Sequence, residues 1–282
     1  MKGMVVQFHS FKGGTGKTML TTNFAYFLSQ MGQKVLLIDA DLLAPSYREI
    51  ITPRDENIVT WSDLLECPEE ELEDNLRLAI QPTGLPNFDI IYSPPPQIGK
   101  SFLIGKEMSW WADALKVMLT KIKPFLLSKY EMIFLDNQNG ISANSSNNIV
   151  MSDLGMLVLR PVSYGMTGTT HTFKELYTKL KGFLRDTERK NFLIWNQIPR
   201  DFRDNGLNKF ADSILDSWDD VFQQIGLKTV ARIDFNPTIA LRMLELPQKG
   251  LLGVFPEIQQ VVESICHEIG LMPKNPFDNL IQ

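Results

Sequence analysis

Two lysines, Lys12 and Lys17, flank a glycine-rich turn near the start of the chain, where residues 8–18 read FHSFKGGTGKT. Glycines let the backbone curl so that successive N–H groups point inward, where they can bind phosphate oxygens. Lys17 would add a positive charge for the terminal phosphates, and the hydroxyl of Thr18 is a ligand that Mg²⁺ accepts. The types and spacing of these residues predict a phosphate-binding loop.

The sequence on either side of the loop supports this prediction. Residues 4–8 are apolar apart from one glutamine and include two β-branched valines, which is typical of a strand. From residue 17 to residue 31 apolar side chains recur at helical spacing, and Gly32 follows where a helix would stop. The alternative is a glycine-rich turn that carries Gly-Lys-Thr by chance. Strand, loop and helix together favour phosphate binding.

Acidic side chains follow two of the predicted strands. Asp39 ends the apolar run at residues 34–39, Asp41 comes two residues later, and Asp136 ends the run at residues 132–136. In open α/β sheets, ligands bind beyond the carboxyl ends of the strands. A carboxylate there can accept a proton from water and coordinate a hard cation. Asp41 and Asp136 are therefore candidate site residues, and strand-end caps are the simpler alternative.

Strands and helices are predicted to alternate along the whole chain. Further strands are expected at residues 88–92, 154–159, 191–196 and 229–233, and helices at 110–127, 167–184, 207–225, 237–246 and 256–269. This alternation predicts an α/β fold with a doubly wound, mostly parallel sheet and helices on both faces. No linker-like boundary interrupts the pattern, so residues 1–282 are expected to form a single domain.

The pattern Lys-Gly-Gly-x-Gly-Lys-Thr at residues 12–18 resembles the deviant Walker A loop of the ParA/MinD family, in the SIMIBI class of P-loop NTPases. The resemblance extends over roughly residues 3–270. It implies a slow ATPase that binds ATP with Mg²⁺, forms a homodimer around them and is stimulated by a partner protein. In the family the first lysine reaches the partner's nucleotide, so Lys12 would act in trans like an arginine finger. A solvated loop lysine is the alternative.

The resemblance also implies which residues form the site. Catalytic roles fall to Lys12, Lys17 and Asp41, with Asp39 in support, and Mg²⁺ contacts to Thr18, Asp41 and Asp136. Residues expected to contact the nucleotide are Lys12, Gly13, Gly14, Thr15, Gly16, Lys17, Thr18, Met19, Gly140, Asn196, Asp234, Phe235 and Asn236.

Two of these segments depart from the family pattern. Residues 136–140 read DNQNG instead of Asp-Thr-Pro-x-Gly, and an amide-rich run continues to Asn148. Loss of the proline is expected to loosen this second switch, where Gly140 would approach the γ-phosphate. The consequence would be either slow hydrolysis or a different switch that is coupled to a partner. Residues 233–237 read IDFNP, without the first proline of the family's Ile-Pro-x-Asp-Pro segment. Asn196 would read adenine, because an amide offers both a donor and an acceptor; a plain turn residue is the alternative.

Composition limits the other chemistry that the chain could perform. The formal net charge is −5, which is not typical of a nucleic-acid or anionic-lipid binder. Cys67 and Cys266 are the only cysteines, so an iron–sulfur cluster or zinc site within one chain is not expected. No apolar run reaches the roughly 18 residues that span a bilayer, and no signal peptide is evident. We therefore expect a cytoplasmic protein.

Two possible partners depend on the distribution of charge. MinD ends in a basic amphipathic helix, whereas the helix expected at residues 256–269 is acidic, so no membrane anchor is expected. Two lysine-biased stretches could contact DNA phosphates or could be solvated helix faces. They hold Lys174, Lys179, Lys181, Arg185, Arg189 and Lys190, and Lys100, Lys106, Lys116, Lys121, Lys123 and Lys129.

Two functional hypotheses follow from the sequence. The first is an ATPase switch of the ParA/MinD type that dimerises around ATP and positions or partitions a cargo, either DNA or cellular machinery. The second is a nucleotide-dependent scaffold, similar to the TadZ-like proteins, with little hydrolysis. Intact Lys12, Lys17, Thr18 and Asp41 favour the switch, and the atypical second switch favours the scaffold. We prefer the switch.

Overall fold

The computed structural model describes residues 3–55, 57–162, 170–171, 174–175, 189–201, 203–243 and 254–273. The strands in this part of the chain are β1 (Met4–His9), β2 (Val35–Ala40), β3 (Gln81–Pro82), β4 (Phe88–Ile91), β5 (Met132–Asn137), β6 (Leu154–Leu159), β7 (Lys190–Ile198) and β8 (Lys228–Asp234). The helices are α1 (Lys17–Gln30), α2 (Tyr47–Ile50), α3 (Trp61–Glu66), α4 (Leu72–Ala79), α5 (Pro96–Leu103), α6 (Met108–Val117), α7 (Lys123–Leu127), α8 (Ala143–Met151), α10 (Asn205–Gln224), α11 (Pro237–Met243) and α12 (Pro256–Ile269). A π-helical turn, η1 (Met118–Ile122), joins α6 to α7.

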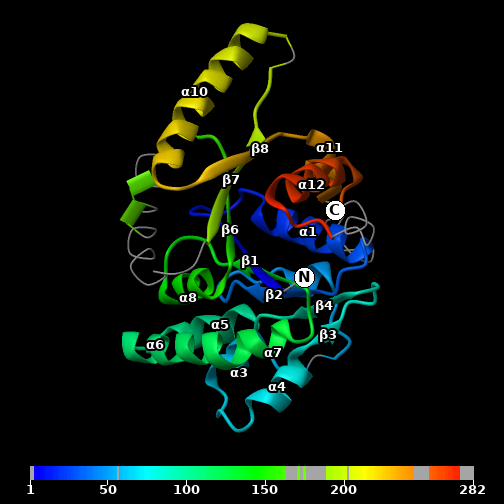
Figure 1. Ribbon diagram of the computed structural model, residues 1–282, viewed down its shortest axis with the longest axis vertical. Helices are drawn as coiled ribbons and strands as arrows, with labels where there is room; N and C mark the ends of the chain where they lie inside the picture. Colours follow the sequence, from blue (N-terminus) through cyan, green and yellow to red (C-terminus); the bar gives the residue numbers. More distant parts are fainter. Residues whose placement is uncertain are drawn as a thin grey trace, which may run out of the picture.

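These strands form one sheet in the order β3-β4-β2-β5-β1-β6-β7-β8 (Figure 1). Neighbouring strands run parallel, except that β3 pairs antiparallel with β4. β3 contains Pro82, which cannot donate to a ladder and suits a short edge strand. The predicted doubly wound, mostly parallel sheet is confirmed.

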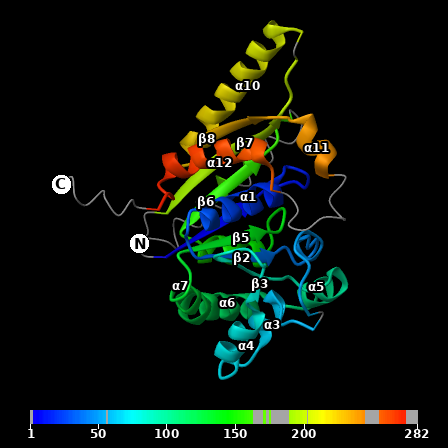
Figure 2. The ribbon, with the colours of Figure 1, turned by 90° about the vertical axis from the view of Figure 1, so that its right-hand side faces the viewer.

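Helices cover both faces of the sheet (Figure 2). On one face, α1 and α12 pack on alternate residues of the strands, including Val6 and Phe8 of β1 and Leu37 of β2. On the other face, the intervening residues pack against α3, α4, α6, α7 and, further along, against α8 and α10. Strands buried on both faces explain why β2, β5 and β6 are almost uninterrupted apolar runs in the sequence.

Most predicted elements agree with the structure within a few residues. The helix predicted at 110–127 is the continuous α6-η1-α7 segment, and the one at 207–225 is α10. The predicted helix at 167–184 falls largely outside the described residues, as does the end of the one at 237–246. In α12, Ile258, Val262 and Ile265 are buried, which confirms that its apolar stripe faces the core.

The order of the strands positions the residues singled out above. β1 lies between β5 and β6, and β2 lies on the other side of β5, so the carboxyl ends of these strands meet at one edge. In this register Asp136 is level with both Phe8 and Asp39. The loop after β1 and the carboxylates after β2 and β5 therefore converge, as the sequence predicts.

Candidate functional site

The glycine-rich loop connects β1 directly to the first turn of α1. Gly14 and Gly16 have φ angles of 77° and 85°, in the left-handed region that glycine adopts without strain. Gly16 caps α1, and no acidic residue lies in the first helical turn. The unpaired N–H groups and the positive end of this 14-residue helix therefore face the loop. Both features favour binding of an anion.

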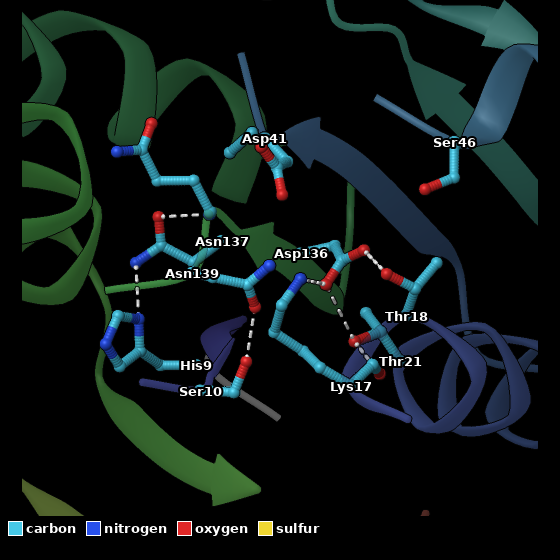
Figure 3. Close-up of polar contacts among 12 residues, drawn as sticks. His9, Ser10, Lys17, Thr18, Thr21, Asp41, Ser46, Asp136, Asn137 and Asn139 are labelled. Atoms are coloured by element: carbon cyan, nitrogen blue, oxygen red, sulfur yellow. Dashed lines mark hydrogen bonds and ion pairs between the residues drawn. The ribbon is translucent and has the colours of Figure 1, made fainter. Parts of the chain in front are cut away.

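Lys17, Thr18 and Asp136 meet behind the loop (Figure 3). The Lys17 ammonium donates to Oδ1 of Asp136 at 2.5 Å, and the Thr18 hydroxyl donates to Oδ2 at 2.6 Å. Thr21 adds a longer contact to Oδ1 at 3.4 Å. Lys17 and Asp136 are 5% and 1% exposed, so each charge depends on the other for stabilisation.

Two further carboxylates follow β2, and both are nearly buried. Asp41 accepts hydrogen bonds from the backbone N–H groups of Ala44 at 2.9 Å and Leu43 at 3.2 Å. Burial raises the pKa of Asp41, although the positive charge of Lys17 opposes this rise. The pKa of Asp39 is raised well above its usual value by burial and by the neighbouring carboxylates of Asp136 and Asp41. A carboxyl with a raised pKa holds a proton more readily, which suits proton transfer.

Tyr47 is a residue of this site that the sequence did not reveal. Its side chain is fully buried, and its hydroxyl lies 3.2 Å from the Thr22 hydroxyl and 3.3 Å from the carbonyl oxygen of Thr18. Its backbone N–H lies 3.4 Å from Oδ2 of Asp39. Tyr47 thus connects the segment after β2 to α1. It follows directly after Ser46, which lines the cavity described below.

The donor set suits a magnesium ion carried by phosphates. Thr18 and Asp41 line the cavity, and Asp136 lies behind it in contact with the Thr18 hydroxyl. All three offer hard oxygen atoms, which are the ligands that Mg²⁺ prefers. No group of three or more His, Cys, Asp or Glu side chains that could hold a metal is found in the described parts of the chain. Mg²⁺ typically binds through one or two carboxylates together with substrate phosphates, which agrees with so small a set.

The loop after β5 is held by hydrogen bonds. The Ser10 hydroxyl donates to Oδ1 of Asn139 at 2.5 Å, and the N–H of Gly140 donates to the carbonyl of Ser10 at 2.9 Å. These two hydrogen bonds hold the turn, and the loosening expected from the missing proline stays a prediction. Gly140 was expected to approach the γ-phosphate, but its N–H is bonded to Ser10, and Asn139 rather than Gly140 lines the cavity.

Side chains of the amide-rich run make further hydrogen bonds next to this loop, at the carboxyl ends of the strands. Asn137 accepts from the side chain of Asn148 at 3.0 Å and donates to the carbonyl of Ser145 at 3.0 Å. Asn144 donates to the carbonyl of Ala40 at 3.1 Å, next to Asp41. Hydrogen bonds of these buried amides hold the segment that a proline would otherwise restrain. They also link α8 to the end of β2.

A cavity of about 490 Å³ opens in front of the loop. Most of the predicted nucleotide contacts line it, namely Gly14, Thr15, Gly16, Lys17, Thr18, Met19, Asn196, Asp234, Phe235 and Asn236, and so does Asp41, which is predicted to act in catalysis and metal binding. Lys12 and Gly13 are exposed and Asp136 is buried, and none of the three lines the cavity. Lining residues that the sequence did not predict are Ala44, Ser46, Asn139, Gln197, Ile233, Ile239, Ala240, Met243 and Ile258.

The far end of the cavity is more apolar than the loop. Met19 comes from α1, and Phe235, Ile239 and Met243 come from α11 and the segment before it. These apolar side chains are of the kind that lines the pocket of a base. Asn196 is 2% exposed and donates from Nδ2 to the carbonyl of Thr15 at 2.8 Å. Asp234 accepts from Arg200 at 2.8 Å.

The structure describes only part of the first lysine-biased stretch and all of the second. Lys179, Lys181 and Arg185 lie outside the described residues. In the second stretch Lys106, Lys121 and Lys123 form ion pairs with Glu66, Glu69 and Asp153. These pairs neutralise part of the positive charge of that stretch.

Comparison with known proteins adds to this geometry. The model of a protein family described as an AAA domain matches residues 3–186, and a virulence plasmid ParA family protein of Chlamydia psittaci is 31% identical over 163 residues. The chain belongs to the ParA/MinD-like P-loop NTPases. The match to the Chlamydia protein covers 57% of this chain and 58% of that protein. The chain spans about half the length of the curated relatives that it matches.

Solved structures of other ParA/MinD-like NTPases share the whole fold. A Cyanothece McdA variant in complex with ATP superimposes with a TM-score of 0.73 at 16% identity, covering 97% of this chain and 98% of that one. MinD from Pyrococcus horikoshii with Mg-ADP superimposes with a TM-score of 0.63 at 20% identity, covering 97% and 100%. Among the described helices of this ParA/MinD-like chain, none has the length and apolar character needed to cross a bilayer.

Proposed function

We propose that this protein is an ATP-binding and ATP-hydrolysing switch that forms a homodimer around ATP and Mg²⁺ and positions or partitions a cargo. The observation that carries the proposal is the meeting of Lys17, Thr18 and Asp136 behind a glycine-rich loop that opens into a cavity. A buried ammonium, a hydroxyl and a carboxylate at a helix N-terminus are the groups needed to hold a triphosphate with its metal.

Each residue has a distinct part in this proposal. The N–H groups of residues 13–18 and the Lys17 ammonium would bind the phosphates, and Thr18, Asp41 and Asp136 would hold Mg²⁺ directly or through water. When bound, Mg²⁺ would neutralise the charge that develops on the phosphate oxygens. Met19, Phe235 and Ile239 would contact the base from the apolar end of the cavity.

The hydrolytic step would depend on Asp41 and Lys12. Asp41 lines the cavity next to the phosphate-binding loop, and its raised pKa suits a group that orients water and accepts its proton. Lys12 is exposed on the rim of the loop, so it can extend beyond its own subunit. We propose that it neutralises phosphate charge in the partner subunit of the dimer.

The scaffold hypothesis keeps support from one feature. The N–H of Gly140 already donates to Ser10, and Asn139 is bonded to the Ser10 hydroxyl. A second switch held in this way would respond less to the γ-phosphate, which favours binding without rapid hydrolysis. The switch remains our preferred proposal because Lys12, Lys17, Thr18 and Asp41 are all present.

The relatives suggest the kind of cargo. One is named as a ParA family protein of a virulence plasmid, and another as the cell division protein PomZ of Myxococcus xanthus. We propose that this protein is cytoplasmic and that a partner protein stimulates its hydrolysis of ATP. DNA is a candidate cargo, or a candidate surface to which the protein binds. The net charge of −5 makes binding of bare DNA by the whole surface unfavourable, so any contact would be confined to lysine-rich stretches.

Calorimetry and a phosphate-release assay together test the proposal. ATP with Mg²⁺ should produce binding heat, and DNA or a partner fraction should accelerate turnover. Lys17→Ala should abolish binding, whereas Lys34→Ala, an exposed lysine at the opposite end of β2, should not. Absence of heat with the unmodified protein would refute nucleotide binding. Tight binding with no turnover under any condition would support the scaffold instead.

A further inference from the structure

The end of β7 contains an unusual backbone conformation next to the phosphate-binding loop. Gln197 has a φ angle of 57°, in the left-handed region that residues other than glycine rarely adopt. The pairing of β7 with β8 shifts register between Trp195 and Ile198, which marks a bulge at this point. Bulges beside functional sites change the direction of side chains.

The bulge lets two neighbouring amide side chains reach the same loop. In a regular strand, consecutive side chains point to opposite faces of the sheet. Here Nδ2 of Asn196 donates to the carbonyl of Thr15 at 2.8 Å, and Nε2 of Gln197 donates to the carbonyl of Gly14 at 3.1 Å. Two consecutive loop carbonyls are therefore bound by two consecutive residues of β7.

These contacts fix the direction of loop N–H groups as well. In a trans peptide the C=O and the following N–H point in opposite directions, because the unit is planar. Binding the Gly14 carbonyl from β7 turns the N–H of Thr15 away from β7, and binding the Thr15 carbonyl does the same for the N–H of Gly16. Residues 14–17 line the cavity, where such N–H groups can meet phosphate oxygens.

The loop and the bulge also fit closely at Gly16. A Cβ atom at this position would collide with Nδ2 of Asn196 and would lie 3.4 Å from Nε2 of Gln197. Glycine is needed here for its φ angle and for the close approach of these amides. The conformation of the loop thus depends partly on residues of β7, which lie far from it in the sequence.

We propose that Gln197 is a positioning residue for the phosphate tail of the nucleotide: with Asn196 it holds the loop carbonyls outward, so that the loop N–H groups face the phosphates. This inference rests on the proposed function, since it names how that same site is formed. In this inference the amide group of Asn196 also positions the loop, in addition to the proposed recognition of adenine. Through its bond to the Gly14 carbonyl Gln197 acts on the ligand by way of the loop, and its side chain also lines the cavity.

Gln197→Gly is the informative variant, because glycine adopts this φ angle without strain while the side chain with its amide is removed. Asn87→Gly is a matched control, since Asn87 also has a φ of 57° but lies in an exposed turn before β4. Three ligands are compared by calorimetry or competition: ATP with Mg²⁺, ADP with Mg²⁺, and inorganic tripolyphosphate, which has no base. Gln197→Glu, which replaces the donor with a charged acceptor, completes the set.

We expect Gln197→Gly to weaken binding of ATP and of tripolyphosphate by the same factor, about fivefold for one neutral hydrogen bond. Gln197→Glu should weaken both further, because its charge repels the carbonyl and the phosphates. In turnover assays KM should rise while kcat changes by less than about twofold, as expected for loss of uniform binding. The melting temperature without ligand should stay near that of the unmodified protein for Gln197→Gly and Asn87→Gly.

Several results would overturn the inference. Equal affinity of Gln197→Gly and the unmodified protein for ATP would refute it while leaving the proposed function intact. A loss for ATP but not for tripolyphosphate would mean that Gln197 acts on the nucleoside instead. A parallel fall in melting temperature would reduce its role to stability. If the unmodified protein bound no nucleotide, the proposed function and this inference would fail together.

Discussion

The ammonium nitrogen of Lys17 and Oδ1 of Asp136 lie 2.5 Å apart in a site from which water is almost excluded. In the proposed complex the lysine binds phosphate and the carboxylate holds Mg²⁺, so nucleotide binding must replace this ion pair with two new contacts. The carboxylate therefore has opposite effects with and without the metal. It opposes binding of bare ATP, because it neutralises Lys17 and repels the phosphates, and it supports binding of ATP with Mg²⁺.

Asp136→Asn should separate these two effects. ATP should bind more tightly than to the unmodified protein when Mg²⁺ is chelated, by about tenfold, because a buried negative charge is removed. Added Mg²⁺ should improve binding less than it does in the unmodified protein, because one of the three proposed metal contacts is lost. Removal of one partner of a buried ion pair should also lower the free energy of unfolding by about 3 kcal/mol. Calorimetry with and without a chelator checks the first effect, and urea unfolding checks the second.

The control for Asp136→Asn is Glu73→Gln, which breaks an exposed ion pair with Arg77. It should leave ATP affinity unchanged and alter stability by less than about 1 kcal/mol. Unaltered Mg²⁺ dependence in Asp136→Asn would exclude Asp136 as a metal contact.

Asp41→Ala should trap an ATP-bound dimer. The carboxylate lines the cavity and is proposed to orient the attacking water, so its loss should reduce turnover by on the order of a hundredfold while ATP still binds. Light scattering coupled to size exclusion in saturating ATP measures the mass directly. A monomer under these conditions would remove this prediction.

Lys12→Ala should abolish turnover and spare ATP binding. A charge supplied in trans contributes on the order of a thousandfold to phosphoryl transfer, whereas the loop that binds ATP would remain intact. Lys34→Ala, another exposed lysine, is the matched control and should behave like the unmodified protein. Normal turnover in Lys12→Ala would leave Lys12 as a solvated loop residue.

His9 predicts a pH dependence of stability. Burial, with help from the positive charges of Lys17 and Arg189, lowers the pKa of His9 from 6.5 to about 3. Between these values the unfolded chain binds a proton that the folded chain does not, so stability should fall as the pH falls below 6.5. The loss should approach about 1.4 kcal/mol per pH unit.

The test of this prediction compares urea unfolding of the unmodified protein and His9→Gln at several pH values from 7 down to about 4. In the variant the free energy of unfolding should change less steeply with pH, by the equivalent of about one bound proton, because glutamine does not titrate. The difference between the two proteins should be largest at the acidic end. Parallel profiles would mean that folding does not lower the pKa of His9.

The sequence predicted the sheet well because its strands are buried on both faces. β2 and β5 each consist of an apolar run followed by an aspartate near the end of the strand, and such runs have few alternatives in an α/β chain. In the region from α2 to α5, β4 agrees with the strand predicted at residues 88–92, but α2, α4 and α5 are not predicted. Its helices are short, α2 has four residues and α3 has six, and only α3 is marked by a clear capping box at Thr60 and Asp63.

The site was predicted where it depends on local spacing. Gly14, Lys17 and Thr18 lie together because they are neighbours in the chain. Gln197 could not be found in this way, since its importance depends on a positive φ angle and a bulge that no sequence motif marks. The hydrogen bond that holds the second switch could not be predicted for a related reason, because Ser10 and Asn139 are far apart in sequence and only the folded structure brings their side chains together.

The central position of β1 has a consequence for how the protein folds. This strand is the first to be synthesised, yet it pairs with residues 132–136 on one side and with residues 154–157 on the other. Contacts between such distant segments close large loops and slow the search for the native state. During synthesis the glycine-rich loop should therefore stay unformed until β5 and β6 have left the ribosome. A nascent chain halted before residue 132 should be sensitive to protease and unable to retain ATP.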